Sequence, residues 1–301
     1  MKESNQVNQL KRKRFKIKSS PPDIVFDVIK IVVLVVSIVL VILPILNIVA
    51  LSLSNGYRNP QVTIIPLGFT FASYGHVLSE LAFLQAFGNS VLATVVVTIA
   101  SNLFMSMAAY PLSKSDCPFK KGITTVFIVT MLFSAGIVPS YLLMVALHLT
   151  NNIWSVILIS INNVYSILLY KSNFLGIPSE IEEAAKIDGA NSIQLFLIII
   201  IPLCLPVFAS CVFFSIVGTW NSYGAALMYI DSAHTSQQPL ALYLYRMLGN
   251  TDKNTSDEWL ITNKSNIEAA TLIISVIPVL LVYPYIIKYV KSGLTLGSVK
   301  E

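Results

Sequence analysis

Residues 180–202 read EIEEAAKIDGANSIQLFLIIIIP, a cluster of charge followed by an apolar run. Ser179, with Glu182 three positions later, predicts a capping box at the start of a short helix. Gly189 is predicted to end that helix in a left-handed conformation. A helix of this length is not stable alone, so the stretch needs a surface to pack against.

The composition indicates that most of this chain lies in a lipid bilayer. Of its 301 residues, 55% are hydrophobic and 12% are charged, whereas soluble domains carry about 25% charged residues. An all-α, polytopic membrane protein is therefore predicted. The net charge of +5 comes from basic residues beside apolar segments. The positive-inside rule explains this placement, and no nucleic-acid partner is expected.

Six apolar segments are predicted as transmembrane helices, because each is near the roughly 20 residues that cross a bilayer. They form a domain over 24–290, between an N-terminal tail at 1–23 and a C-terminal tail at 291–301. The first is interpreted as a retained span, although a small-residue site at 50–52 leaves cleavage open. The segments are approximately 24–51, 82–110, 122–147, 153–170, 198–227 and 266–288.

The distribution of Lys and Arg predicts the orientation of the chain. Sixteen of the twenty fall in 1–30, in 111–121, in 171–197 and in 288–301. Both termini and the stretch 180–202 are therefore expected in the cytoplasm. No charged residue lies well inside a predicted span, which argues against an ion-coupled carrier.

The chemistry of an enzyme is not visible in the sequence. There is no G-x-x-x-x-G-K-[ST] loop for ATP, and the three histidines are scattered. The three cysteines have no metal-binding spacing, and Cys204 and Cys211 are interpreted as one packed face. We expect no catalytic residue, no metal site and no cofactor in this chain.

The stretch also carries a spaced motif. Glu183-Ala184-Ala185, Gly189 and Ile199-x-Ile201-Pro202 resemble the EAA motif of ABC importer permeases, Glu-Ala-Ala-x3-Gly-x9-Ile-x-Leu-Pro. Ile201 stands where that motif has Leu. Other segments resemble carbohydrate permeases of the maltose-importer MalG type, and within that type the LplC/YtcP-like oligosaccharide and polysaccharide subgroup. These segments are 109–113, 133–143, 220–223, 239–240, 283–285 and 293–300.

The resemblance implies a type I ABC importer permease in a bacterial cell membrane, forming half of a carbohydrate path. It implies four partners besides lipid: a second homologous permease, an ATPase dimer that binds ATP and Mg, an extracytoplasmic solute-binding protein and the carbohydrate. A coupling helix over about 179–189 would dock in a groove of the ATPase. The coupling residues would be Glu182, Glu183, Ala184, Ala185, Asp188, Gly189 and Pro202.

Individual roles follow from that resemblance. Glu182 and Glu183 would offer carboxylates to basic groups on the ATPase, and Ala184 and Ala185 would keep the docking face narrow. Pro202 would add a bending point to the fifth span. The tail would also reach the ATPase, with a disordered tail as the alternative; its residues are Gly293, Thr295 and Gly297.

Two questions stay open in the sequence. Asn163, Trp220, Asn221 and Tyr223 are candidates for the sugar path, but bonds between helices or an interfacial aromatic belt are the favoured interpretation for most of them. The solute could also be an amino acid, phosphate or peptide, or the chain could be a stand-alone channel or membrane protein. The identity and length of the sugar are not specified by these residues.

Overall fold

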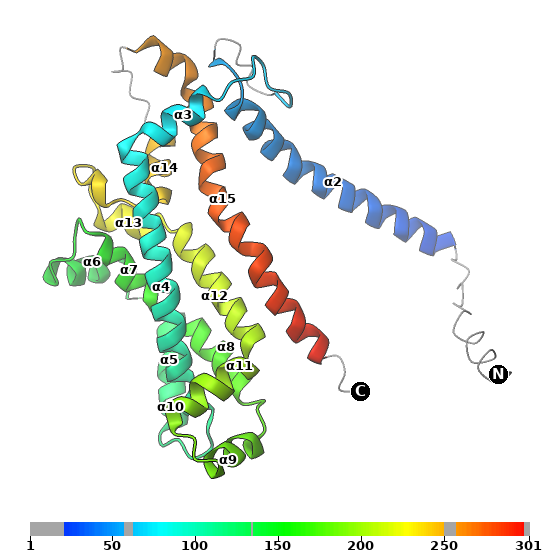
Figure 1. Ribbon diagram of the computed structural model, residues 1–301, viewed down its shortest axis with the longest axis vertical. Helices are drawn as coiled ribbons and strands as arrows, with labels where there is room; N and C mark the ends of the chain where they lie inside the picture. Colours follow the sequence, from blue (N-terminus) through cyan, green and yellow to red (C-terminus); the bar gives the residue numbers. More distant parts are fainter. Residues whose placement is uncertain (1–20, 57–62, 134, 250–256, 298–301) are drawn as a thin grey trace.

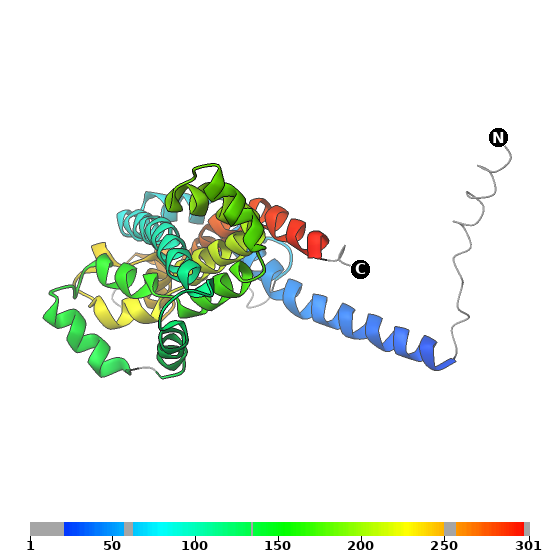
Figure 2. The ribbon, with the colours of Figure 1, turned by 90° about the horizontal axis from the view of Figure 1, so that it is seen from below.

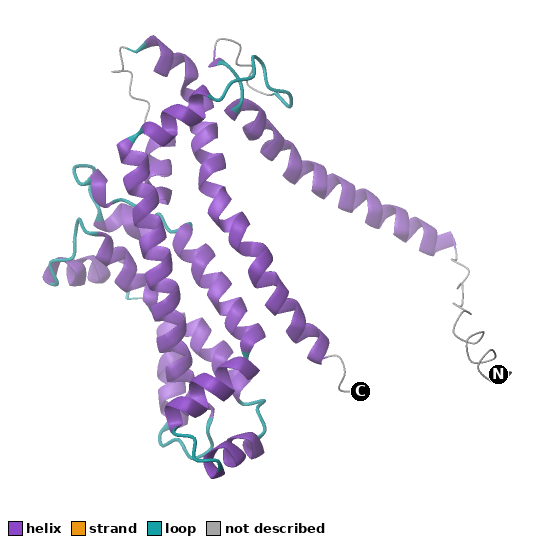
Figure 3. Cartoon of the chain, in the orientation of Figure 1, coloured by secondary structure: helices purple, strands orange, loops and turns teal. Residues whose placement is uncertain are grey.

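The computed structural model describes residues 21–56, 63–133, 135–249 and 257–297. Within these ranges every regular element is a helix (Figure 3). The all-α prediction is therefore confirmed for the described part of the chain. Residues 1–20 of the expected N-terminal tail lie outside it.

A long central helix, α4 (Leu81–Ser113), organises the bundle. It packs against α7 (Ile153–Ile161), α8 (Val164–Phe174) and α12 (Leu205–Trp220). On its other side, α12 packs against the last helix, α15 (Glu258–Gly297). Figure 1 shows α4, α12 and α15 running along the long axis of the molecule.

The helix α2 (Pro21–Ser52) extends away from this bundle (Figure 2). None of its most apolar stretch is buried. Its C-terminal end is attached to α15, where Asn266 Nδ2 donates to Leu51 O (2.8 Å) and to Ser54 O (3.0 Å). The helix is thus fixed at one end and uncovered along most of its length.

Shorter helices occupy two connections between the predicted spans, 52–80 and 228–265. The first contains α3 (Ala72–Ser79). The second contains α14 (Leu240–Gly249), with η3 (Thr235–Gln237) before it. In Figure 1, α3 and α14 lie at the end of the bundle opposite α9 (Ser179–Ile187).

Within the described ranges, four helices are long and apolar enough to cross a membrane, or up to six if each of two bent pairs is one span. The four are Val25–Ser52, Leu81–Ser113, Ile153–Phe174 and Glu258–Val290. The last three are longer than the predicted segments, and the first has the predicted length, shifted by one residue. The backbone of α15 also remains helical through most of the predicted tail at 291–301.

The other two predicted spans are bent. The segment 122–147 becomes α5 (Lys120–Leu132) and α6 (Ile137–Ala146), at 106° to each other. Gly136 between them has φ +87°, a conformation that glycine adopts readily and other residues do not. The segment 198–227 breaks at Cys204, with an 86° bend, and ends in a separate helix, α13 (Gly224–Tyr229).

Candidate functional site

The stretch 180–202 forms a compact helical corner at the end of the bundle. After α9 come α10 (Ser192–Gln194), the π-helix η2 (Leu195–Ile200) and α11 (Ile201–Leu203). The corner shares one apolar cluster with α4 and α8, built around Ala109, Leu112, Ile167, Tyr170, Phe174, Ala185, Leu195, Phe196 and Ile200. The short helix thus has the packing surface that its length requires.

The start of α9 differs from the prediction. Ser179 is the first helical residue, Pro178 occupies the cap position, and no side chain caps the helix. The capping box predicted at Ser179 and Glu182 is therefore wrong. A capping box is present at α10 instead, where Asn191 Oδ1 accepts from Gln194 N (2.8 Å) and Gln194 Oε1 accepts from Asn191 N (3.0 Å).

The end of α9 is a Schellman motif, and the prediction for Gly189 is confirmed. Gly189 has φ +83°. Its N–H donates to Lys186 O (3.0 Å), and the N–H of Ala190 donates to Ala185 O (3.0 Å). These are the two bonds that define the motif. A Cβ added at Gly189 would meet nothing within 4 Å, so backbone conformation, rather than space, favours glycine there.

The two faces of α9 have different surroundings. Glu182 and Ala185 are its buried residues. Glu183, Ala184 and Ile187 are exposed, and Ile187 is 86% exposed. The two alanines therefore point to different faces, because they are adjacent in a helix. Ile187, an isolated apolar side chain in solvent, was missed by the sequence analysis, although its spacing from Glu183 and Ala184 could have indicated it.

The Glu182 carboxylate has a partner within the chain. Its carboxylate forms an ion pair with Lys114 Nζ at the end of α4, and only 10% of the Glu182 side chain is exposed. The expectation that Glu182 faces an ATPase does not fit this arrangement. The pairing also explains the missing capping box, because the carboxylate points to α4 and not back to the start of its own helix. Glu180, Glu183 and Asp188 are the acids left on the surface.

The corner then turns sharply into α12. Ile201 N–H donates to Phe196 O, the wide bonding pattern of a π-helix. Pro202 has no N–H to donate, and Cys204 N–H is shared between Ile200 O and Ile201 O (both 3.1 Å). Pro202 thus lies within the bent segment, two residues before the 86° break. The break places Cys204 in the same buried cluster as Cys211.

The candidate sugar contacts do not form one cluster. Trp220 is buried, and its Nε1 donates to Ser275 O (3.0 Å). Asn163 caps α8 by accepting from Ser166 N (3.2 Å). Asn221 bonds to its own helix through Val217 O (2.9 Å). Tyr223 is exposed and stacks on Tyr245, with ring centroids 5.0 Å apart.

A polar cavity of about 650 Å³ lies next to that tyrosine pair and was missed by the sequence analysis. Its lining includes Glu80, Gln238, Tyr243, Tyr245 and Arg246. Arg246 donates to Gln238 Oε1 (2.9 Å) and Ile230 O (2.7 Å). Burial raises the pKa of the Tyr243 hydroxyl, which stays protonated and donates to Glu80 Oε2 (2.8 Å). Arg246 could have indicated this cavity, because it is among the few basic residues in the loops that were not predicted to face the cytoplasm.

Nearby, the connection after α6 is tied to the connection after α13. Asn151 Nδ2 donates to Asp231 Oδ2 (2.9 Å), and Asp231 N donates to Asn151 Oδ1 (2.9 Å). A hydrogen bond with His234 (2.7 Å) lowers the pKa of the Asp231 carboxyl. This carboxylate is therefore ionised at neutral pH, so the hydrogen bond from Asn151 Nδ2 is made to a charged group.

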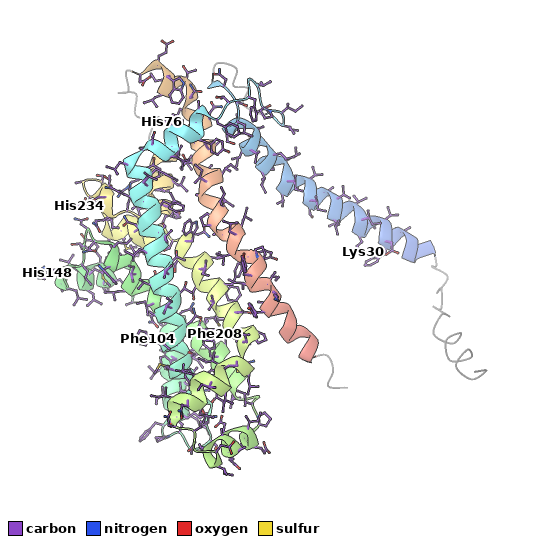
Figure 4. The ribbon with its side chains drawn as sticks, in the orientation of Figure 1. Lys30, His76, Phe104, His148, Phe208 and His234 are labelled. Carbon is purple, nitrogen blue, oxygen red and sulfur yellow. The ribbon has the colours of Figure 1, made fainter. Side chains whose placement is uncertain are left out.

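The described residues contain no group of three or more His, Cys, Asp or Glu side chains placed to hold a metal ion. In Figure 4, His76 lies at one end of the molecule, away from His148 and His234. The tail residues Gly293, Thr295 and Gly297 fall in the last turns of α15. Their backbone is helical, so the predicted ATPase contact would come from a helix end.

Comparison with known proteins identifies the family. The family model described as "Binding-protein-dependent transport system inner membrane component" matches residues 115–295, which is more than half of the chain. The chain belongs to this family. The EAA stretch lies inside the match, so the resemblance read from Glu183, Gly189 and Pro202 is confirmed at the level of the family.

Relatives of this permease share most of its length. Protein LplC of Bacillus subtilis is 34% identical, over 92% of this chain and 95% of LplC. The B. subtilis polygalacturonan/rhamnogalacturonan transport system permease protein YtcP is also 34% identical, over 79% of this chain and 84% of YtcP. The permease is thus similar to LplC over nearly its whole length and to YtcP over 79% of it.

Among solved structures, the permease is similar to a chain of a bacterial ABC transporter involved in the import of the acidic polysaccharide alginate. The TM-score is 0.82 at 30% identity, covering 90% of this permease and 98% of that chain. The predicted fold, that of an ABC importer permease with membrane-spanning helices, is therefore confirmed.

Proposed function

We propose that this permease is one of two membrane subunits of an importer that carries an oligosaccharide or a polysaccharide fragment. A separate ATPase dimer would dock on α9, and an extracytoplasmic solute-binding protein would deliver the sugar at the opposite end. The relatives support a sugar as the solute: YtcP is named for polygalacturonan and rhamnogalacturonan, and the similar structure belongs to a transporter involved in alginate import.

One observation carries the coupling part of the proposal, namely the uncovered outer face of α9. Its inner face is buried in the corner, while Glu183, Ala184 and Ile187 point outward. Ile187 would fill an apolar groove and Glu183 would meet a basic group, which is how a short helix is recognised in a groove. In the described part of the chain nothing covers Ile187, which is 86% exposed.

The proposed mechanism moves α9 as a rigid lever. When the ATPases close on ATP they would push α9, whose inner face is packed on the cluster shared with α4, α8 and η2. The push would reach α12 through the 86° bend and change the tilt of the spans. Solute would then be exposed to one side and afterwards to the other.

At the far end, the cavity beside Tyr223 and Tyr245 is the candidate entrance for solute. Carbohydrates are held by aromatic faces and by amide, hydroxyl and guanidinium groups, and Tyr245, Gln238 and Arg246 line the cavity. We assign this end to the outside and α9 to the cytoplasm, following the distribution of basic residues. Bilayer lipid would cover the remaining apolar surface.

The coupling part is tested in the assembled complex. The wild-type permease should co-purify with an ATPase and a second permease. Glu183→Lys and Gly189→Asp should leave the protein in the membrane but abolish solute-stimulated ATPase activity and uptake. Glu258→Lys, the same charge reversal at the far end, is the matched control and should keep both. Normal uptake by Glu183→Lys would overturn the docking of α9.

The sugar is tested separately with the cognate solute-binding protein. Neutral oligosaccharides, uronic-acid oligosaccharides, peptides and phosphate would each be offered to the reconstituted complex. Stimulation of ATP hydrolysis by an oligosaccharide alone is the expected result. Stimulation by a peptide or by phosphate alone would overturn the proposal that the solute is a sugar, and it would leave the assignment as a permease intact.

A further inference from the structure

The geometry points to Lys114 as a positioning residue that couples α9 to α4. Its ammonium is held between the Glu182 carboxylate of α9 and the Tyr110 ring of α4. Lys114 would thus give the coupling helix a second connection into the membrane, besides the continuous chain that leads to α12. The inference rests on the proposed function, since it assumes that α9 receives the force of an ATPase.

The surroundings of Lys114 hold its charged end in place. Lys114 is the C-terminal cap of α4, and its Nζ lies 4.4 Å from the centroid of the Tyr110 ring. A cation over an aromatic face is attracted to it, most strongly when water is excluded. Only 27% of the Lys114 side chain and 10% of the Glu182 side chain are exposed. The ion pair is therefore shielded from the solvent that weakens surface pairs.

The carbonyl groups at this end of α4 are bound as well. Lys120 Nζ donates to Ser113 O (3.2 Å) and to Lys114 O (2.9 Å). The last carbonyls of a helix have no partner within the helix, so such a donor stabilises the helix end. Lys114 is thus held at its backbone by Lys120 and at its ammonium by Glu182.

Tyr110 extends the connection to two further helices. Its ring centroid lies 5.8 Å from that of Phe174 in α8 and 5.4 Å from that of Phe196 in η2. Glu182, Lys114, Tyr110 and these two phenylalanines form an unbroken series of contacts. A displacement of α9 would therefore reach α4 and α8 directly, and not only α12.

The pair also accounts for much of what fixes α9. Glu182 and Ala185 are its two buried residues. Ala185 contributes one methyl group to the apolar cluster, whereas Glu182 forms a charged link to another element. Breaking a buried pair by removing one partner is costly, because the remaining charge has no compensation. A helix released on that side could shift without moving α4.

The experiment compares Lys114→Met, Lys114→Arg, Glu182→Gln and the exchanged pair Lys114→Glu/Glu182→Lys. Each is reconstituted with the second permease, the ATPase and the solute-binding protein. The measurement is solute taken up per ATP hydrolysed, normalised to assembled complex. Lys114→Met and Glu182→Gln should lower this ratio about tenfold, because coupling between two sites in a protein is typically worth about 5- to 150-fold.

Lys114→Arg should stay close to wild type, because its guanidinium can bind both a carboxylate and an aromatic ring. The exchanged pair should recover much of the ratio, since a residue pair in contact is not additive. Lys121→Met, which removes an exposed lysine nearby, is the matched control and should change nothing. Glu182→Gln keeps the side-chain length and serves if Lys114→Met does not assemble.

Two results would overturn the inference. If the variants lower only the amount of complex, and uptake per ATP is unchanged, Lys114 has a structural role alone. If the exchanged pair is no better than either single variant, the ion pair is not the connection. A wild-type complex that shows no ATP-dependent uptake would instead overturn the proposed function.

Discussion

Gly189 shows how one backbone angle limits the sequence of α9. With φ +83° and free space around an added Cβ, substitution there costs conformational energy and not a clash. Asn adopts the left-handed region more easily than other residues with a side chain, and β-branched residues are the least suited to it. The position therefore offers a graded perturbation of the turn alone.

We expect the unfolding temperature of Gly189→Asn to be close to that of the wild type. Gly189→Val should lose about 1–2 kcal/mol of local stability. In Gly189→Val the turn after Ile187 should loosen, and uptake per assembled complex should fall. Thermal unfolding of the complex and transport assays check this. Equal behaviour of the two variants would show that the left-handed angle is not what matters.

If Trp220 bonds helices together and does not contact solute, its substitution should change stability and not solute preference. Trp220→Phe removes the bond from Nε1 to Ser275 O, and should cost about 0.6–1.7 kcal/mol, the range for bonds between helices in a membrane. The set of accepted solutes should stay the same. Trp154→Phe, at a half-exposed ring, is the control. A changed solute preference in Trp220→Phe would place this ring in the sugar path.

At this scale one local pattern, the Gly189 turn, was predicted correctly, the capping box at Ser179 and Glu182 was wrong, and long-range pairings were not visible. The Gly189 turn depends on residues within one helical turn, so its spacing was enough to predict it. Glu182 and Glu183 look alike in the sequence. What separates them is Lys114, which is 68 positions from Glu182, and no short pattern connects the two. The spacing of Ile187 from Glu183 and Ala184 places it on their face of the helix, but which face stays uncovered depends on the fold around it.

At the scale of helices, polar side chains connect α4, α8 and α12. Asn102 of α4 donates to Ser215 Oγ (3.2 Å) and accepts from Tyr170 OH (2.7 Å). All three residues are buried. In an apolar environment an unpaired polar group is costly, so these bonds favour one arrangement of the three helices.

Asn102→Leu should leave the hydroxyl of Tyr170 and that of Ser215 without this partner. We expect a loss of about 1–3 kcal/mol, seen as a lower unfolding temperature in detergent. Ser106→Ala is the control, because the Ser106 hydroxyl bonds only to Leu103 O of its own helix among the described contacts. An unchanged unfolding temperature in Asn102→Leu would mean that apolar packing alone fixes the three helices.

The existence of the apolar helices was predictable, but the two bends were not. Composition and length detect a segment that can sit in lipid, and they do not distinguish a straight span from a bent one. The break near Gly136 and the break at Cys204 depend on a positive φ and on Pro202 beside a π-helix. Both signals are present in the sequence, yet glycine and proline also occur in continuous spans.

At the scale of the whole molecule, the described ends of the chain and α9 lie towards the same side. Figure 1 shows the start of α2 and the end of α15 both directed away from α3 and α14. This agrees with the side that the basic residues assign to the cytoplasm. The orientation can be measured in intact cells.

We expect a membrane-impermeant maleimide to label His234→Cys in intact cells and to label Lys121→Cys only after permeabilisation. Both positions are exposed, and they belong to opposite sides in the proposed orientation. Cys117→Ser provides the background, because Cys204 and Cys211 are buried. Labelling of Lys121→Cys in intact cells would invert the proposed orientation.

The separation of α2 from the bundle has a consequence for how the protein is made. During synthesis α2 emerges before α4, and it needs no later helix to be stable in lipid, because its backbone bonds are internal and its surface is apolar. By contrast, α4 carries Asn102, whose partners in α8 and α12 are translated afterwards. The nascent chain is thus anchored in the bilayer by α2, which is stable without later helices, while α4 gains its partners as α8 and then α12 are translated.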